Sequence, residues 1–234
     1  MSERHDPDVT LPWMRDGTRR FLAAVESLED REFAHPSGLP GWSRAHVIGH
    51  VAGNADALIR LTSWADTGVE CPMYESREQR NSEIESTAAM TPDELRRLSV
   101  DTAAALDRAL AGLDERGWTA TVRSALGRVI PAAEIPWMRI REVWLHAIDI
   151  GGAVELGSFP SGIVDLLLDD TVAALSARDG CPSLILAPAD RARTWVLGPE
   201  QENGPVLDLS AAVLAGWTTG RSSPADLPAL PSWI

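Results

Sequence analysis

Three side chains that could bind a metal ion lie in two widely separated segments of the chain. Glu142 and His146 are four residues apart in a largely apolar stretch, and His50 follows a Gly-Trp-Ser sequence at positions 41–43. Residues four apart on an α-helix are separated by about 6 Å along the axis and lie on nearly the same face, so Glu142 and His146 can point at one ion. His50 would complete a set of two imidazoles and one carboxylate. Three protein ligands are typical of catalytic zinc sites, because they leave one coordination position open.

The spacing alone leaves two alternatives open. A glutamate and a histidine four residues apart can also form an ordinary ion pair on a solvated helix face, which contributes only a few tenths of a kcal/mol. His46 lies four residues before His50 and has a ligand-like spacing of its own. The spacing does not say which of these two histidines faces inward.

The composition indicates a folded protein with small-molecule rather than polyanionic partners. The chain has 234 residues, of which 44% are hydrophobic, and a net charge of -13. That charge makes a nucleic-acid backbone or an anionic membrane an unfavourable partner. No apolar run approaches the roughly 20 residues that span a bilayer, and the first residues lack the apolar core of a signal peptide. We therefore expect a cytoplasmic protein without nucleic-acid or membrane partners.

The cationic and sulfur-containing residues exclude several kinds of chemistry. All 21 cationic side chains are arginine, which excludes a lysine Schiff base and a lysine-dependent phosphate loop. Anionic substrates must therefore be held by arginine or by a metal ion. Cys71 and Cys181 are the two cysteines, and their spacing offers neither a disulfide framework nor a thiolate zinc cluster.

Apolar residues at helical spacing predict four principal helices in the first part of the chain. Thr91-Pro92-Asp93-Glu94 is a capping box with proline at the first helical position, and Ser43 can cap another helix. The predicted helices cover about 11–28, 43–59, 91–113 and 137–150, with a short charged helix at 75–87 and an extended excursion at 119–130. Four helices with modest connections predict a bundle, and bundles build metal sites from inward-pointing side chains. The proposed ligands lie on the second and the last of these helices.

The pattern changes after Gly152, which predicts two domains at 1–152 and 153–234. The second part predicts helices at 160–177 and 211–219, the latter capped by Ser210, and short strands at 183–187, 194–197 and 206–209. The expected fold class is α+β, with a four-helix bundle followed by a small α/β domain of about 80 residues.

Two segments resemble the metal-site segments of the mycothiol-dependent maleylpyruvate isomerases, which belong to the DinB-like superfamily. They are residues 39–52, with the sequence Leu-Pro-Gly-Trp-Ser-Arg-Ala-His-Val-Ile-Gly-His-Val-Ala, and residues 137–149, with the sequence Trp-Met-Arg-Ile-Arg-Glu-Val-Trp-Leu-His-Ala-Ile-Asp. The resemblance extends to 67–74, 80–84 and 215–221 and covers nearly the whole chain, loosely only between about 180 and 205. It implies an N-terminal DinB-like four-helix bundle and a small C-terminal α/β domain.

The resemblance also implies a metal, a thiol and a reaction. In that family the histidine at the end of the Gly-Trp-Ser segment and the Glu and His of the later helix bind a divalent ion, typically Zn²⁺. These roles fall on His50, Glu142 and His146, so the resemblance favours His50 over His46. The implied activity is the cis-trans isomerisation of maleylpyruvate to fumarylpyruvate, in gentisate-type aromatic catabolism, with the low-molecular-weight thiol mycothiol as cofactor.

Further site residues are expected around this centre. Arg80 and Arg221 lie in matched segments and are the candidates for holding the dicarboxylate substrate and the thiol cofactor, with His50 as the catalytic ligand. Arg221 follows the last predicted helix, so an active site between the domains is expected if it reaches the pocket. Trp42, beside the first ligand segment, is expected at the cofactor, and Trp144 could line the pocket.

Each metal-binding histidine needs an acceptor for its other ring N–H. Asp149 and Asn54 are predicted for His146 and His50, because each lies about one helical turn away. Two other functions remain open from the sequence. One is a thiol S-transferase of the same superfamily, and the other is a non-catalytic protein that binds a metal or an apolar ligand.

Overall fold

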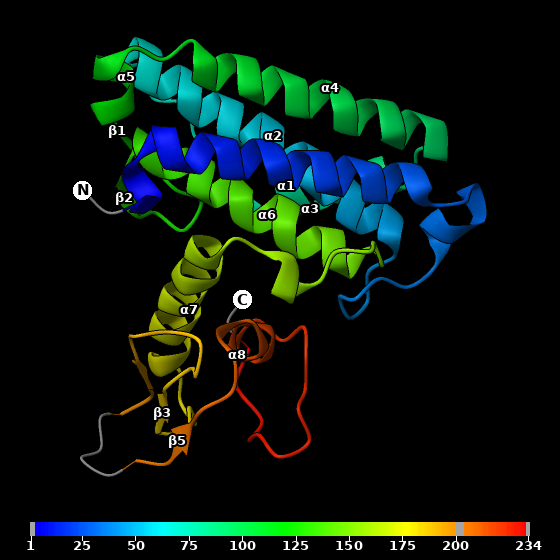
Figure 1. Cartoon of the computed structure of the whole chain (residues 1–234). Helices are drawn as coiled ribbons and strands as arrows, with labels where there is room; N and C mark the ends of the chain where they lie inside the picture. Colours follow the sequence, from blue (N-terminus) through cyan, green and yellow to red (C-terminus); the bar gives the residue numbers. More distant parts are fainter. Residues whose placement is uncertain (1–2, 200–203, 233–234) are drawn as a thin grey trace. The chain divides into compact units, whose positions relative to one another are not determined.

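The structure is a computed structural model that describes residues 3–199 and 204–232. The chain divides into two compact units, Met1–Val154 and Glu155–Ile234. The first unit is helical and carries all three candidate metal ligands, and the second combines helices with a small sheet (Figure 1). The predicted α+β fold class, with a four-helix bundle and a small α/β domain, is confirmed.

Four long helices form the bundle: α1 (Pro7–Ser27), α2 (Arg44–Thr67), α4 (Pro92–Ala111) and α6 (Ile135–Asp149). Helix α2 packs against α4 and α6, and α1 packs against the same two helices, as the ribbon in Figure 1 shows. The core between them is built from large apolar side chains, among them Phe21, Ile48, Leu58, Leu95, Leu106 and Ile140. These are the apolar positions whose helical spacing predicts the four helices.

Capping residues decide where these helices begin. The Thr91 hydroxyl accepts from the main-chain N–H of Glu94, and the Glu94 carboxylate accepts from that of Thr91, which confirms the predicted capping box. Helix α1 begins at Pro7 rather than at the predicted Leu11, because the carboxylate of Asp6 caps it.

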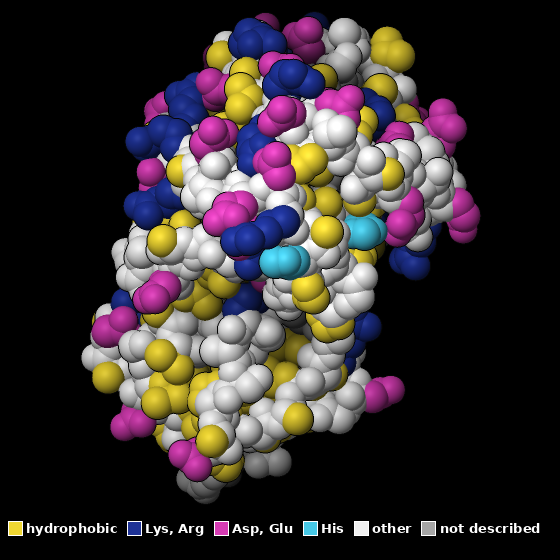
Figure 2. All heavy atoms as spheres, turned by 90° about the vertical axis from the view of Figure 1, so that its right-hand side faces the viewer, with side chains coloured by type: hydrophobic (Ala, Val, Ile, Leu, Met, Phe, Trp, Pro, Cys, Tyr) yellow, Lys and Arg dark blue, Asp and Glu magenta, His cyan; other side chains and the backbone are white. Residues whose placement is uncertain are grey.

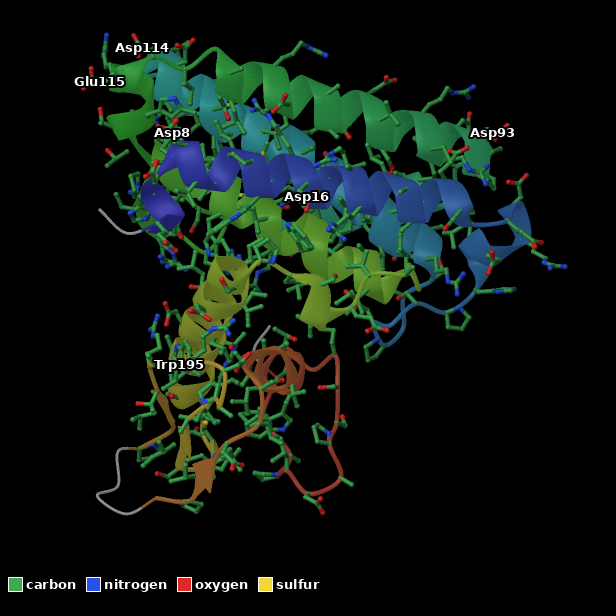
Figure 3. The ribbon with its side chains drawn as sticks, in the orientation of Figure 1. Asp8, Asp16, Asp93, Asp114, Glu115 and Trp195 are labelled. Carbon is green, nitrogen blue, oxygen red and sulfur yellow. The ribbon has the colours of Figure 1, made fainter. Side chains whose placement is uncertain are left out.

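Acidic side chains accompany several helix starts (Figure 3). Asp8 and Asp93 lie in the first turns of α1 and α4, and Asp114 caps the short helix α5 (Glu115–Thr119). A negative charge there interacts favourably with the positive end of the helix dipole.

Short elements connect the bundle helices. Helix α3 (Arg77–Ala88), the predicted charged helix, packs against α2. The predicted extended excursion is an antiparallel hairpin of β1 (Thr121–Arg123) and β2 (Val129–Pro131). Short 3₁₀ turns occupy Glu3–His5, Asp30–Ala34 and Ala132–Glu134, and the last of these leads into α6 two residues earlier than predicted.

The second unit contains a mixed three-stranded sheet and two helices. After a 3₁₀ turn at Leu156–Ser158 come α7 (Ser161–Ser176), β3 (Leu184–Leu186), β4 (Trp195–Leu197), β5 (Val206–Leu207) and α8 (Ala211–Thr218). The strand order is β4-β3-β5, with β3 antiparallel to β4 and parallel to β5. Helix α7 packs against α8 and β4. Across the described residues, every helix is too short or too polar to cross a membrane.

Candidate metal centre

The structure brings the three predicted ligand side chains together between α2 and α6. Nε2 of His50 lies 2.9 Å from Oε2 of Glu142, and Nε2 of His146 lies 3.1 Å from the same oxygen. One ligand atom from each residue lies within 4.8 Å of the others. Both histidines are buried and Glu142 is half-buried. The group therefore has the donor types and the proximity that a divalent ion requires.

Helical geometry explains which side chains of α6 reach this point. Glu142 and His146 are separated by about one turn and share a face, whereas Trp144 between them points about 200° away from each. Trp144 is accordingly buried against α1, where its Nε1 donates to the main-chain oxygen of Trp13 at 3.0 Å. The expectation that Trp144 lines the pocket is therefore wrong.

His146 is fixed by the acceptor that the sequence predicts. Its Nδ1 lies 2.7 Å from Oδ2 of the buried Asp149. The main-chain oxygen of Asp149 accepts from the N–H of Gly38 at 2.7 Å, and a Cβ atom at position 38 would lie 3.1 Å from Oδ1 of Asp149. Because the Asp149 carboxylate favours a proton on Nδ1 of His146, Nε2 is left as the donor atom for a metal.

The charges of the three groups follow from burial and from their mutual contacts. Burial opposes ionisation of Glu142, but the two imidazoles outweigh it and hold the pKa of the carboxyl well below its usual range. Burial lowers the pKa of His50, and Glu142 offsets this only in part. For His146 burial also favours the neutral form, but the hydrogen bonds of Asp149 and Glu142 outweigh it and raise the pKa. At neutral pH the site therefore offers an ionised carboxylate and a neutral His50.

Arg80, on α3, lies beside His50. Its Nη2 is 3.2 Å from Nδ1 of His50, and its guanidinium carbon is 5.8 Å from the centre of the Tyr74 ring. Burial raises the pKa of Tyr74, with Arg80 opposing that rise. Tyr74 is the single tyrosine of the chain, and its place at the site was not predicted although it ends one of the matched segments.

His46 lies outside the ligand group. Its Nδ1 is 2.6 Å from the Ser43 hydroxyl and 3.3 Å from the Ser43 main-chain N–H, so the side chain takes part in the cap of α2. Its Nε2 lies 3.4 Å from Glu85. The geometry thus agrees with the choice of His50 over His46.

Trp42 lies against both histidines of this segment. Its ring stacks on His46 with 6.4 Å between centres and meets the ring of His50 edge-on at 5.5 Å. On the face of the bundle seen in Figure 2, histidine side chains reach the surface beside arginine and apolar side chains. Trp42 and Arg80 thus place an aromatic ring and a guanidinium beside His50.

The structure contradicts the predicted role of Asn54 and does not test that of Arg221. Asn54 does not bind His50, because its Oδ1 accepts from Nη1 of Arg139 at 2.9 Å, so its predicted role is wrong. Arg221 belongs to the second unit, where its Nη1 donates to the main-chain oxygen of Thr219 at 2.7 Å. Its role at the site, like that of Trp42, stays a prediction.

The fold and this side-chain group define a class of protein: a DinB-like four-helix bundle with a candidate centre of two histidines and one glutamate. In solved structures the same bundle occurs in YfiT from Bacillus subtilis, described as a probable metal-dependent hydrolase with an unusual four-helix bundle topology. That match has 15% identity, covers 62% of this chain and 85% of that chain, and has a TM-score of 0.51, so it shows the fold alone.

Two other solved structures match over almost the full length. Both are crystal structures of the mycothiol-dependent maleylpyruvate isomerase, one of them a histidine-to-alanine mutant. Each is 34% identical to this chain and covers 97% of both chains, with TM-scores of 0.92 and 0.91. Residues 14–151 match the protein-family model described as the mycothiol maleylpyruvate isomerase N-terminal domain. No curated protein sequence matches. The chain belongs to the mycothiol-dependent maleylpyruvate isomerase family and is an isomerase.

Proposed function

We propose that this protein converts maleylpyruvate to fumarylpyruvate, using mycothiol as a thiol cofactor and a divalent ion, typically Zn²⁺, held by His50, Glu142 and His146. The observation that carries the proposal is the convergence of these three side chains between α2 and α6. The full-length likeness to a mycothiol-dependent maleylpyruvate isomerase supports the same substrate and thiol.

The donor set fits such an ion. Two imidazole nitrogens and one carboxylate oxygen are ligands that zinc accepts, and Asp149 supplies the outer hydrogen bond that orients His146. A bound Zn²⁺ ion would leave a position open for sulfur and would favour the thiolate form of a thiol whose free pKa is near 8.5.

A thiolate is the reagent that this isomerisation requires. The substrate's cis double bond does not rotate, so it must become single for a time. Addition of the thiolate forms a carbon–sulfur bond and moves the double-bond electron pair into the conjugated carbonyl as an enolate. After rotation, the carbon–sulfur bond breaks and the electron pair returns to form the trans double bond. The thiol is recovered unchanged, which makes it a cofactor rather than a substrate.

The surrounding arginines supply positive charge for the substrate. The guanidinium of Arg80 lies within 3.2 Å of a ligand histidine and against the Tyr74 ring, so it can hold a carboxylate next to the metal group. Arg221, the other candidate, would hold the second carboxylate. Because the chain has no lysine, arginine is the cationic side chain available for this purpose.

The test is a spectroscopic assay with purified protein, maleylpyruvate and mycothiol. We expect an ultraviolet spectral change that requires the thiol and a divalent ion, while the free thiol concentration stays constant. Stoichiometric consumption of the thiol would instead identify a thiol S-transferase. The absence of any thiol-dependent change would overturn the proposal.

A further inference from the structure

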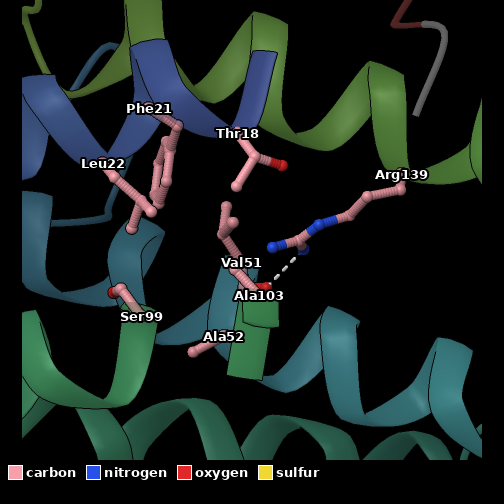
Figure 4. A pocket seen from close by; sticks show the side chains of 8 residues that line it. All are labelled: Thr18, Phe21, Leu22, Val51, Ala52, Ser99, Ala103 and Arg139. Carbon is pink, nitrogen blue, oxygen red and sulfur yellow. Dashed lines mark hydrogen bonds between the residues drawn. The ribbon is translucent and has the colours of Figure 1, made fainter. Parts of the chain in front are cut away.

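Arg139 is a buried arginine on α6, three residues before Glu142. Its side chain is 2% exposed. Its Nη1 donates to the main-chain oxygen of Val51 at 2.6 Å and to Oδ1 of Asn54 at 2.9 Å, both on α2. Figure 4 shows the side chain extending from α6 toward α2, with the bond to α2 drawn as a dashed line. One side chain therefore ties together the two helices that carry the ligands.

These bonds lie in the layer of the α2–α6 contact next to the ligand group. Asn54 follows His50 by one turn on α2, and Arg139 precedes Glu142 by about one turn on α6. Because α2 and α6 run antiparallel, the Arg139–Asn54 contact therefore lies one turn along the helix pair from the His50–Glu142 contact. Val51 is the residue directly after His50. The guanidinium thus holds the α2 backbone at the point from which the His50 side chain projects.

A charged group in this position is costly in free energy. Burial lowers the pKa of Arg139 to about 10, so the guanidinium is still protonated at neutral pH. Both of its hydrogen-bond acceptors are neutral, and the carboxylates of Glu142 and Asp56 offset only part of the cost of burial. The cavity that it lines is mostly apolar, with Thr18 and Ser99 as the other polar residues (Figure 4). A well-packed apolar residue is often at least as stabilising as a buried charge. An arginine at this position therefore contributes two hydrogen bonds to α2 that an apolar residue of the same size could not make.

We propose that Arg139 is a positioning residue, which fixes the register of α2 against α6 so that His50 meets Glu142 and His146 around one ion. The inference rests on the metal site of the proposed function, but not on the identity of the substrate or the thiol. It predicts that the loss of the Arg139 bonds weakens metal binding more than the loss of stability explains.

The test measures zinc affinity by competition with a chromophoric chelator, alongside the midpoint of thermal unfolding. We expect Arg139→Met to weaken zinc binding about tenfold or more, the range found for outer partners of metal ligands. Arg139→Lys keeps a donor and should recover most of the affinity. The matched control is Leu110→Ala, which removes a fully buried side chain of α4 close to α5, at the other end of the bundle (Figure 1). It should lower the unfolding midpoint without changing zinc affinity.

A second pair of variants keeps the test decisive if Arg139→Met does not fold. Asn54→Asp retains an acceptor oxygen for the guanidinium and should bind zinc as the wild type does, whereas Asn54→Leu removes the acceptor and should bind it several-fold more weakly. In Asn54→Leu, cobalt(II) bound in place of zinc should also show an altered visible spectrum, which reports coordination geometry.

The results separate this inference from the proposed function. Wild-type protein that binds no zinc would overturn the proposed metal site itself. Wild-type protein that binds zinc, with Arg139→Met binding it equally well or Leu110→Ala weakening it equally, would overturn the positioning role alone. Equal zinc affinity in Asn54→Leu and Asn54→Asp would do the same.

Discussion

Nδ1 of His146 lies 2.7 Å from Oδ2 of Asp149, and this contact has opposite consequences for the proton and for the metal. The carboxylate raises the pKa of His146 against the effect of burial. It also orients the ring and makes Nε2 a better donor to a cation. A proton and a metal ion therefore compete for the same nitrogen.

Zinc affinity is expected to depend on pH through His146. Metal binding requires the neutral imidazole, so below the raised pKa of His146 the affinity should fall by about tenfold for each pH unit, and above it the affinity should level off. Asp149→Asn removes one of the two carboxylates that raise the pKa of His146 and leaves Glu142 in place, so the pH range in which the affinity is constant should extend to lower pH. Chelator competition at a series of pH values measures this.

Asp149→Asn should also bind zinc about tenfold more weakly at the higher pH values, where the affinity no longer depends on pH. The variant thus loses affinity at high pH but keeps its affinity constant down to a lower pH, so the two effects can be measured separately. If Asp149→Asn shifts neither the pH profile nor the limiting affinity, the orienting role of Asp149 is wrong.

His50→Ala should abolish zinc binding and isomerisation while leaving the helical content largely intact. The control is His46→Gln, four residues away, because glutamine preserves the capping interaction that His46 makes at the start of α2. That control should bind zinc as the wild type does. Equal losses in both variants would show that damage to α2, and not removal of a ligand, explains the result.

Arg80→Met should raise KM for the dicarboxylate substrate by about tenfold or more, since one charge-assisted hydrogen bond contributes about 1.5 kcal/mol or more. The zinc affinity should not fall, because Arg80 offers Nδ1 of His50 a donor group, whereas a metal-bound histidine is oriented by an acceptor at that nitrogen. Steady-state kinetics with saturating thiol measure the first effect and chelator competition the second. An unchanged KM would remove Arg80 from the substrate site.

Two glycine positions test the packing of the bundle. A Cβ atom on Gly17 of α1 would lie 2.4 Å from Nε1 of Trp144, so Gly17→Ala should destabilise the protein by about 1–3 kcal/mol. A Cβ atom on Gly53 of α2 would have no neighbour within 4 Å, so Gly53→Ala should stabilise the protein by roughly 0.5–1 kcal/mol. Urea unfolding measures both changes, and a neutral Gly17→Ala would contradict the close approach of α1 and α6.

The sequence predicts the helices of this protein better than the contacts between them. Helical spacing and the capping box at Thr91 define the bundle, and a four-residue interval places Glu142 and His146 on one face. The pairing of His50 with them depends on how α2 packs on α6. Periodicity does not give this interhelical register, and only the family resemblance indicated it.

The wrong predictions for Asn54 and Trp144 arise from the same missing information, which is how the helices pack on one another. Asn54 is one turn from His50, but its partner comes from the facing helix, and Trp144 is adjacent to the site in sequence but on the opposite side of α6. The residue type alone gives no reason to choose Arg139, since α6 carries a second arginine, Arg141, two residues later. The available signal was its position on the same stripe of α6 as Glu142 and His146.

The most direct test of the central claim is to add mycothiol to protein that carries one equivalent of cobalt(II) in place of zinc. If His50, Glu142 and His146 hold an ion with a position open for sulfur, one equivalent of thiol should produce a near-ultraviolet sulfur-to-cobalt absorption band, and His50→Ala should show none. Wild-type protein that binds cobalt but gives no such band with the thiol would contradict the account.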